Sequence, residues 1–116
     1  MLSFPKSAIQ DFVESALYPL EVSFLEHGSF NALLPTLHEL RKTVKANGWW
    51  APHMPTEVGG MGLDLVELAQ IGEVLGQSPL GHYVFGCQAP DAGNMEVLHQ
   101  FGTPEQQDRF FKPLVA

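Results

Sequence analysis

Five histidines and one cysteine are the side chains of this sequence best suited to metal binding or nucleophilic chemistry. Two imidazoles that share a metal on one helix stand four residues apart, and no pair of these histidines has that spacing. We therefore interpret each histidine as a solvated or hydrogen-bonded side chain, and we expect no metal site. The five histidines are His27, His38, His53, His82 and His99.

Cys87 stands near His82 and Asp91 in the sequence, which leaves open a cysteine nucleophile activated by a histidine. Such chemistry needs the thiol and the imidazole in contact, and sequence spacing does not establish contact. A small buried apolar side chain is the more ordinary role for a single cysteine. One cysteine also excludes an internal disulfide and a cysteine-rich zinc site.

Glycines cluster in the segment GGMG at 59–62, as they do in loops whose main-chain N–H groups approach a phosphate. A phosphate loop follows a strand, and the Walker type adds a lysine, but neither feature is present here. We therefore predict that residues 48–63 form a long structured loop in which at least one glycine adopts a positive φ. Glu57 is expected to cap loop N–H groups rather than to act in catalysis. The residues assigned to structural roles in the loop are Pro55, Glu57, Gly59, Gly60 and Gly62.

Charge and composition narrow the class of partner. Thirteen acidic side chains against six lysines and arginines give a net charge of −7. Six scattered cations do not form the basic footprint that nucleic acid requires, and the charge also argues against an anionic membrane surface. No run of about 18 apolar residues could span a bilayer. No targeting signal is visible, so we expect a cytoplasmic protein.

Helices must position these residues, because apolar side chains recur at three- and four-residue steps between glycine and proline breaks. The stripe from Ile9 to Phe24 predicts a first helix that Pro19 should kink or end. No alternating strand pattern or hairpin signal occurs, so the predicted class is all-α, and 116 residues suffice for one domain. A second predicted helix carries the apolar stripe Leu33–Val44, a third begins at the cap Asp64, and a short fourth covers residues 80–86. A fifth begins at the cap Asp91. The last begins at the cap Thr103, and its apolar face consists of Phe110, Phe111, Leu114 and Val115.

Two features near the helix ends carry expectations of their own. Trp49 and Trp50 are adjacent and point in different directions, so one is expected in the core and the other toward a partner or ligand. The last predicted helix reaches Ala116 without a cap. Fraying of a free chain end is one explanation, and excision from a longer protein is the other.

Three segments, in the right order, resemble the acyl-CoA dehydrogenase family in its N-terminal helical domain, and a fourth resembles one branch of it. Residues 48–62 resemble the family loop G-x-x-x-P-x-x-P-x-E-x-G-G-x-G, and residues 73–78 resemble the helix end E-x-L-G-x-S. Residues 102–107, together with Arg109, Pro113 and Leu114, resemble the segment G-T-x-E-Q-x-x-R-x-x-P-L. Residues 87–96, CQAPDAGNME, resemble a branch that includes members fused to a phosphotransferase-like domain.

This resemblance implies an orthogonal bundle of about five to six helices over residues 1–116, cut from a larger FAD-dependent enzyme. In the family, FAD lies between a middle β-domain and a C-terminal helical domain, and a carboxylate of the latter domain removes the α-proton of an acyl-CoA thioester. Neither of those domains is expected here. The resemblance therefore implies no catalytic residue and no FAD on this chain alone. The implied partners are the two missing domains and an acyl-CoA substrate, with self-association through the uncovered surface.

The resemblance also implies that this domain forms one wall of the acyl pocket. Core packing is the competing explanation for Phe85, Met95 and Leu98. An exposed face that the missing domains would cover is expected from Phe85, Gln88, Ala89, Ala92 and one of the two tryptophans. The predicted pocket residues, carried over by position, are Val84, Phe85, Gln88, Ala89, Ala92 and Met95.

Two other functions stay open at this point. A free-standing helical module could keep the same fold and bind a partner or an apolar ligand without catalysis. A hydrolase that depends on Cys87 is the third alternative.

Overall fold

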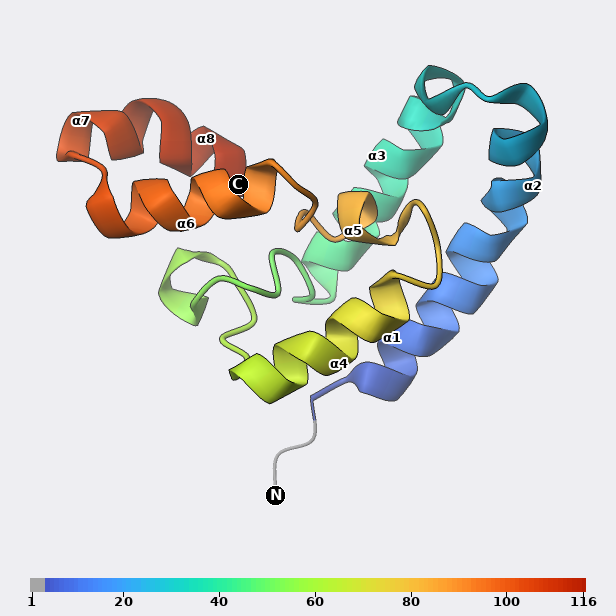
Figure 1. Ribbon diagram of the computed structural model, residues 1–116, viewed down its shortest axis with the longest axis horizontal. Coiled ribbons are helices and arrows are strands. Elements are labelled where there is room, and N and C mark those ends of the chain that lie inside the picture. The colour runs from blue at the N-terminus through green and yellow to red at the C-terminus, as the bar shows by residue number, and fades with distance from the viewer. Residues whose placement is uncertain (1–3) are drawn as a thin grey trace.

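Residues 4–116 are described by a computed structural model, and within them every regular element is helical (Figure 1). The all-α prediction is therefore confirmed. The helices form six rods, two of which contain a short π-helical turn. The elements are α1 (Lys6–Phe12), the π turn η1 (Val13–Leu17), α2 (Tyr18–His27), α3 (Phe30–Ala46), the 3-10 turn η2 (Thr56–Val58), α4 (Leu65–Leu75), α5 (Gly81–Val84), α6 (Asp91–Phe101), α7 (Pro104–Gln106), the π turn η3 (Gln107–Phe111) and α8 (Lys112–Val115).

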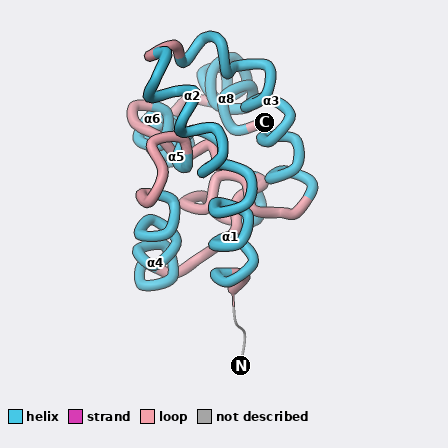
Figure 2. Tube along the Cα trace, turned by 90° about the vertical axis from the view of Figure 1, so that its right-hand side faces the viewer, coloured by secondary structure: helices cyan, strands magenta, loops and turns pink. Residues whose placement is uncertain are grey.

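The rods build a slab rather than a sphere. The α1–α2 rod turns back at Gly28 into α3, and α4 packs beside α1 (Figures 1 and 2). The short α5 packs on α3 and α4, and α6 forms a hairpin with the α7–α8 rod at the other end of the molecule. The molecule measures 44 × 38 × 21 Å, so its thickness is about two helix diameters.

Both π turns stand directly ahead of a proline. The turn η1 ends at Leu17, two residues before Pro19, and η3 ends at Phe111, two residues before Pro113. Proline has no N–H to donate and its ring crowds the preceding turn, so a wider turn accommodates it. Pro19 was predicted to kink or end the helix. The rod instead continues through αR backbone, with a local change from α to π pairing.

Local capping signals read from the sequence are confirmed at two helix starts. The Asp64 carboxylate accepts a hydrogen bond from the Glu67 N–H (2.8 Å), and the Glu67 carboxylate accepts one from the Asp64 N–H (3.0 Å). Thr103 and Gln106 form the same reciprocal box at α7. The prediction for Asp91 is wrong, because Asp91 is the first residue inside α6 and makes no cap.

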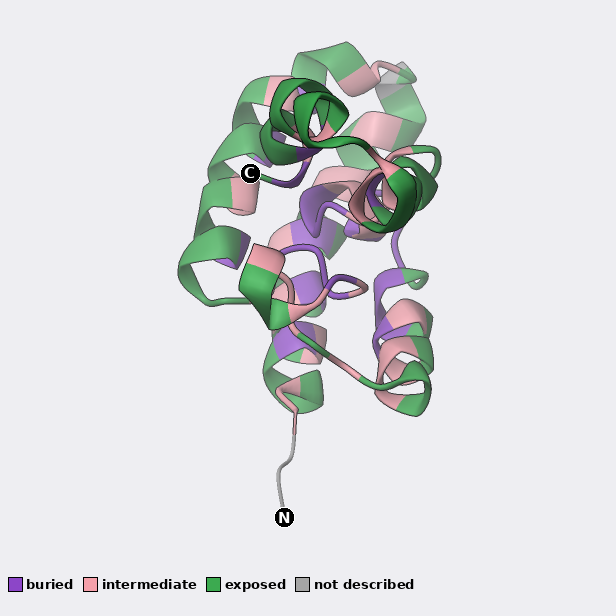
Figure 3. Cartoon of the chain, turned by 90° about the vertical axis from the view of Figure 1, so that its left-hand side faces the viewer, coloured by how far each residue is buried: buried purple, intermediate pink, exposed green. Residues whose placement is uncertain are grey.

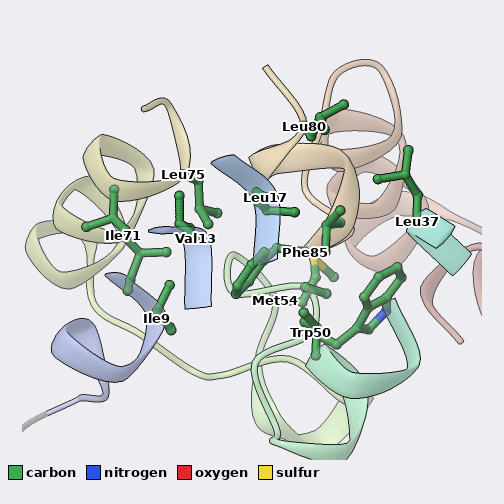
Figure 4. Close-up of a cluster of buried hydrophobic side chains, with 14 of the residues drawn as sticks. Ile9, Val13, Leu17, Leu37, Trp50, Met54, Ile71, Leu75, Leu80 and Phe85 are labelled. Carbon is green, nitrogen blue, oxygen red and sulfur yellow. The ribbon is translucent and has the colours of Figure 1, made fainter. Parts of the chain in front are cut away.

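The core is a band of apolar side chains between α1, α3, α4 and α5 (Figure 4). Trp50 belongs to this band, which confirms that one of the two tryptophans lies in the core, and its neighbour Trp49 is half-buried against the same core. Each large side chain removed from water stabilises the fold by roughly 1.5–3 kcal/mol before the entropy of ordering is counted. Buried positions lie on the inward faces of the helices (Figure 3). Among the core residues are Ile9, Val13, Leu17, Leu37, Met54, Ile71, Leu75, Leu80 and Phe85.

Several apolar side chains remain on the surface. Phe110 was predicted on the buried face of the last helix, but it is half exposed, and only Phe111 and Val115 of that face are buried. Phe101 and Val97 on α6 are also exposed, and with Phe110 they border a hollow of about 360 Å³ between α6 and η3. Within residues 4–116 every helix is too short or too polar to cross a bilayer.

Candidate functional site

An apolar groove of about 200 Å³ lies where α4, α5 and the start of α6 meet the loop after Trp50. One side of the groove comes from α4, through Leu68, Ile71 and Leu75. Gly72 has no side chain, and the space that a Cβ would occupy there is empty to a distance of 4 Å. The groove therefore reaches the α4 backbone at this position. The opposite side is formed by Cys87 and Ala92. Its shape and apolar character suit a hydrocarbon segment rather than a charged ligand.

Three of the predicted pocket residues lie in the core instead. Val84 and Phe85 have no solvent exposure, and Met95 has 1%. Phe85 stacks on Trp49, with ring centroids 6.3 Å apart, and meets the edge of Phe12 at 5.7 Å. The expectation that Phe85 lies on an exposed apolar face is therefore wrong, because its ring completes the aromatic packing of this chain itself.

The other three predicted residues lie at the start of α6, and they reach different environments. Ala92 lines the groove, whereas Ala89 is exposed. The Gln88 side-chain NH₂ group donates to the Asp91 carboxylate (3.0 Å), while its Oε1 atom is buried without a hydrogen-bond partner in the described chain. Gln88 thus holds the turn that begins α6. Of the six predicted pocket residues, Ala92 is the one that lines the groove.

His53 is the polar group at the mouth of the groove. Neither ring nitrogen has a hydrogen-bond partner among residues 4–116, although both are buried. Burial lowers the pKa of His53, and the nearby Glu96 carboxylate and the Ala92 main chain oppose that shift only in part. His53 is therefore a neutral imidazole at pH 7, a weak donor and acceptor beside an apolar space. The expectation of a solvated side chain does not hold for the ring nitrogens of His53, which are both buried.

Cys87 faces the same groove, and its environment does not suit a nucleophile. Burial raises the pKa of its thiol to about 12, so the thiolate is absent at neutral pH. His82 also borders the groove. A cysteine hydrolase requires a depressed thiol pKa, and the groove produces the opposite shift. Among the described residues, no three histidine, cysteine or acidic side chains are placed to hold a metal.

The glycine loop beside the groove adopts the predicted conformation. Gly59 has φ 95° and Gly62 has φ 64°, which confirms the expectation of a positive φ. Gly60 is needed for a different reason, since a Cβ there would lie 2.0 Å from the Met54 carbonyl oxygen. The prediction that Glu57 caps loop N–H groups is wrong: its carboxylate accepts only from the Thr56 hydroxyl in the described chain.

Main-chain bonds within the loop replace the expected cap. The N–H groups of Val58 and Gly60 donate to the Pro55 carbonyl, at 3.3 and 3.0 Å, and the N–H of Gly62 donates to the Met54 carbonyl at 3.0 Å. These N–H groups are therefore engaged and do not form a cradle for an anion. The acids Asp64 and Glu67 stand at the helix start that follows, where they would repel a phosphate.

Sequence reasoning missed His53 and Glu96 as neighbours at one groove. Forty-three positions separate them, and no local pattern of spacing joins the loop after Trp50 to the outer side of α6. Only the packing of α4 and α6 against that loop brings them together.

Comparison with known proteins identifies the fold. Residues 5–116 match the family model described as "Acyl-CoA dehydrogenase, N-terminal domain". Acyl-CoA dehydrogenase family member 10 of Mus musculus is 38% identical over 112 residues, which cover 90% of this chain and 10% of that protein. A protein of Mycobacterium tuberculosis, "Probable acyl-CoA dehydrogenase FadE2", is 37% identical over 82 residues, or 70% of this chain and 19% of that one.

A solved structure of a Mycobacterium abscessus protein described as an acyl-CoA dehydrogenase superimposes with a TM-score of 0.85 at 34% identity. The match covers 95% of this chain and 30% of that one. The chain thus spans between a tenth and a third of the length of these relatives. Its sequence and its fold agree on the same assignment: this chain belongs to the acyl-CoA dehydrogenase family and corresponds to its N-terminal domain.

Proposed function

We propose that this chain is the N-terminal helical domain of an FAD-dependent acyl-CoA dehydrogenase, the class that desaturates an acyl-CoA thioester between its α and β carbons. In that protein the groove between α4 and α6 forms part of one wall of the acyl pocket. The observation that carries the proposal is the apolar groove with Ala92 at its edge, in a chain of this family. An alkyl chain placed there would lie against Leu68 and Ala92, which are only partly buried.

The glycine loop of this chain does not fit the phosphates of FAD. A flavin dinucleotide needs free main-chain N–H groups or cations for its phosphates. The N–H groups of the glycine loop are engaged within the loop, and acids cap the helix that follows it. The flavin is therefore assigned to other parts of the protein, and we derive no reaction step for this chain.

The test uses this chain in its longest native reading frame, with acyl-CoA substrates of increasing chain length. We expect bound flavin, dye reduction that depends on acyl-CoA, and a change in length preference for Ala92→Phe. The added ring occupies the groove, so each methylene that loses its place lowers kcat/KM about fourfold. Asn94→Phe is the matched control, because it adds the same ring on the exposed side of α6.

Two outcomes would contradict the proposal. A protein that binds no flavin and oxidises no acyl-CoA would favour the free-standing apolar-ligand module. If Ala92→Phe lowered kcat/KM equally for short and long substrates, the groove would not be part of the acyl pocket. The chain of residues 1–116 alone is expected to bind no FAD, and stoichiometric flavin on it would contradict the assignment of flavin to other domains.

A further inference from the structure

His53 stands at the boundary between two hollows of the molecule. The first is the apolar groove, and the second is a hollow of about 400 Å³ lined by the loop after Trp50 and by α6. His53 and Glu96 border both hollows, so these two side chains form the partition between them. The loop supplies His53 and α6 supplies Glu96, and the partition therefore depends on α6 lying against the loop.

Both ring nitrogens of His53 are covered by atoms of this chain itself. They are buried and have no hydrogen-bond partner among residues 4–116, although part of the side chain is exposed. A water molecule or a group from outside therefore reaches them only after the covering atoms have moved. A neutral imidazole leaves one N–H donor without an acceptor in this position, whereas a protonated imidazole would leave two donors and a buried charge.

A positive charge on His53 would gain little from its surroundings. On α6, the Glu96 carboxylate attracts the proton, but it is exposed to solvent and forms no ion pair with His53 in the described chain. His99 on α6 and His82 on α5 would add like charges if they bound protons. The residues that α4 contributes to the groove are uncharged, and Cys87 keeps its proton. Burial therefore dominates and lowers the pKa of His53.

The loop on which His53 stands is fixed by its main chain and by a buried neighbour. The N–H of Ala51 donates to the Phe85 carbonyl at 2.9 Å, and the N–H of Met54 donates to the Ala51 carbonyl at 2.9 Å. Met54, the next residue after His53, is 2% exposed. The loop therefore cannot carry the imidazole away from α6 without losing these bonds and this core contact.

The element on the other side of His53 is less firmly attached. Helix α6 pairs chiefly with the α7–α8 rod, and together they form the α6–α8 hairpin, residues 91–115, at one end of the molecule (Figure 1). Two contacts that tie this hairpin to the core are the buried Met95 side chain and the Trp50 indole N–H, which donates to the Val115 carbonyl at 2.8 Å. The hairpin is therefore the part that moves when the site of His53 opens.

We propose that His53 forms a pH-sensitive contact: its neutral imidazole holds the α6–α8 hairpin against the loop after Trp50, and its protonation releases the hairpin. The released form exposes the imidazole to water, where the usual pKa is about 6.5, whereas burial lowers the pKa in the closed form. The released form thus binds the proton more readily, so acid favours release. One proton changes the opening equilibrium by at most about tenfold per pH unit, starting near pH 6.5 and ending below the pKa of the closed form.

The test measures hydrogen exchange of main-chain amides by mass spectrometry between pH 7.5 and pH 5.0, on this chain in its longest native reading frame. Each exchange rate is compared with the intrinsic rate at the same pH, so the resulting protection factor reports opening alone. The protection factor of α6 should fall below pH 6.5, by up to about tenfold per pH unit. At every pH, α3 should stay better protected than α6, because release of the hairpin leaves α3 folded.

Variants connect the acid effect to His53. His53→Gln removes the titrating group, so the acid-dependent fall in α6 protection should disappear. His38→Gln makes the same replacement at an exposed position of α3 and should keep the wild-type fall. Glu96→Gln removes the charge that favours the protonated imidazole in the closed form, so the fall should become larger and extend to lower pH. His53→Phe keeps a ring that does not titrate, and it preserves the test if His53→Gln fails to fold.

Three results would overturn the proposal. Constant protection of α6 from pH 7.5 to pH 5.0 would show that protonation does not release the hairpin. An equal fall in the wild type and in the two His53 variants would assign the effect to another group. Equal protection of α6 and α3 at every pH would mean that the chain opens only as a whole.

Discussion

Replacing Gly60 with alanine should destabilise the loop more than the same replacement at Gly59, although only Gly59 has a positive φ. At Gly60 the new Cβ would lie 2.0 Å from the Met54 carbonyl oxygen and 2.7 Å from the Met54 Cβ. That carbonyl accepts the Gly62 N–H, and Met54 is 2% exposed, so neither can move without loss. Overpacking costs about 1–3 kcal/mol and the lost hydrogen bond about 1 kcal/mol, so the free energy of unfolding of Gly60→Ala should fall by roughly 2–4 kcal/mol.

Gly59→Ala provides the matched control. Its φ of 95° is strained for alanine, but nothing lies within 4 Å of the new Cβ, so about 1 kcal/mol is expected. For a domain of this size each kcal/mol lowers Tm by about 4 °C, which separates the two variants in thermal unfolding followed by circular dichroism. The reasoning is refuted if Gly59→Ala is the more destabilising variant, or if Gly60→Ala unfolds at the wild-type temperature.

Two further predictions concern the groove and the surface. Because burial raises the Cys87 pKa from 9.0 to about 12, the unfolded chain loses this proton first, and the free energy of unfolding should fall between pH 9 and pH 12 by at most about 1.4 kcal/mol per pH unit. Urea unfolding at several pH values should show this slope in the wild type and a smaller one in Cys87→Ala. The exposed apolar hollow at Phe101 should cause the chain to self-associate, as measured by sedimentation velocity. Phe101→Asp should abolish this association, whereas Asn94→Asp, which adds the same charge at another exposed position of α6, should not. A wild type that is monomeric at every concentration would contradict the prediction.

Local signals predicted local structure well. The capping boxes at Asp64 and Thr103 depend on side chains and N–H groups three residues apart, so their geometry follows from the sequence alone. Periodicity also predicted the inward faces beyond the π turns, since Leu20 and Phe24 on α2 pack against the core. Phe110, which lies inside the second π turn, is the predicted apolar side chain that reaches the surface.

The site required long-range information that the sequence does not contain. Of the residues assigned to the pocket by resemblance, Ala92 lines the groove, whereas the burial of Phe85 depends on Phe12 and Trp49, which arrive from distant segments. The Arg41 guanidinium lies over the Trp50 and Tyr83 rings, a contact between separate elements that no local spacing predicts.

The 21 Å thickness of the molecule has a thermodynamic consequence. A slab two helices thick keeps all of its interior within about one helix diameter of water, and its radius of gyration of 14.6 Å exceeds the roughly 13.4 Å expected for 116 residues. Such a chain encloses less volume per unit surface, so its own interior supplies a smaller share of its stability. A partner that binds a broad face of the folded domain, and not the unfolded chain, would stabilise the domain by mass action. The stabilisation is about 2.7 kcal/mol when the partner is present at 100 times its Kd. Melting temperature is therefore a sensitive reporter of binding for this domain.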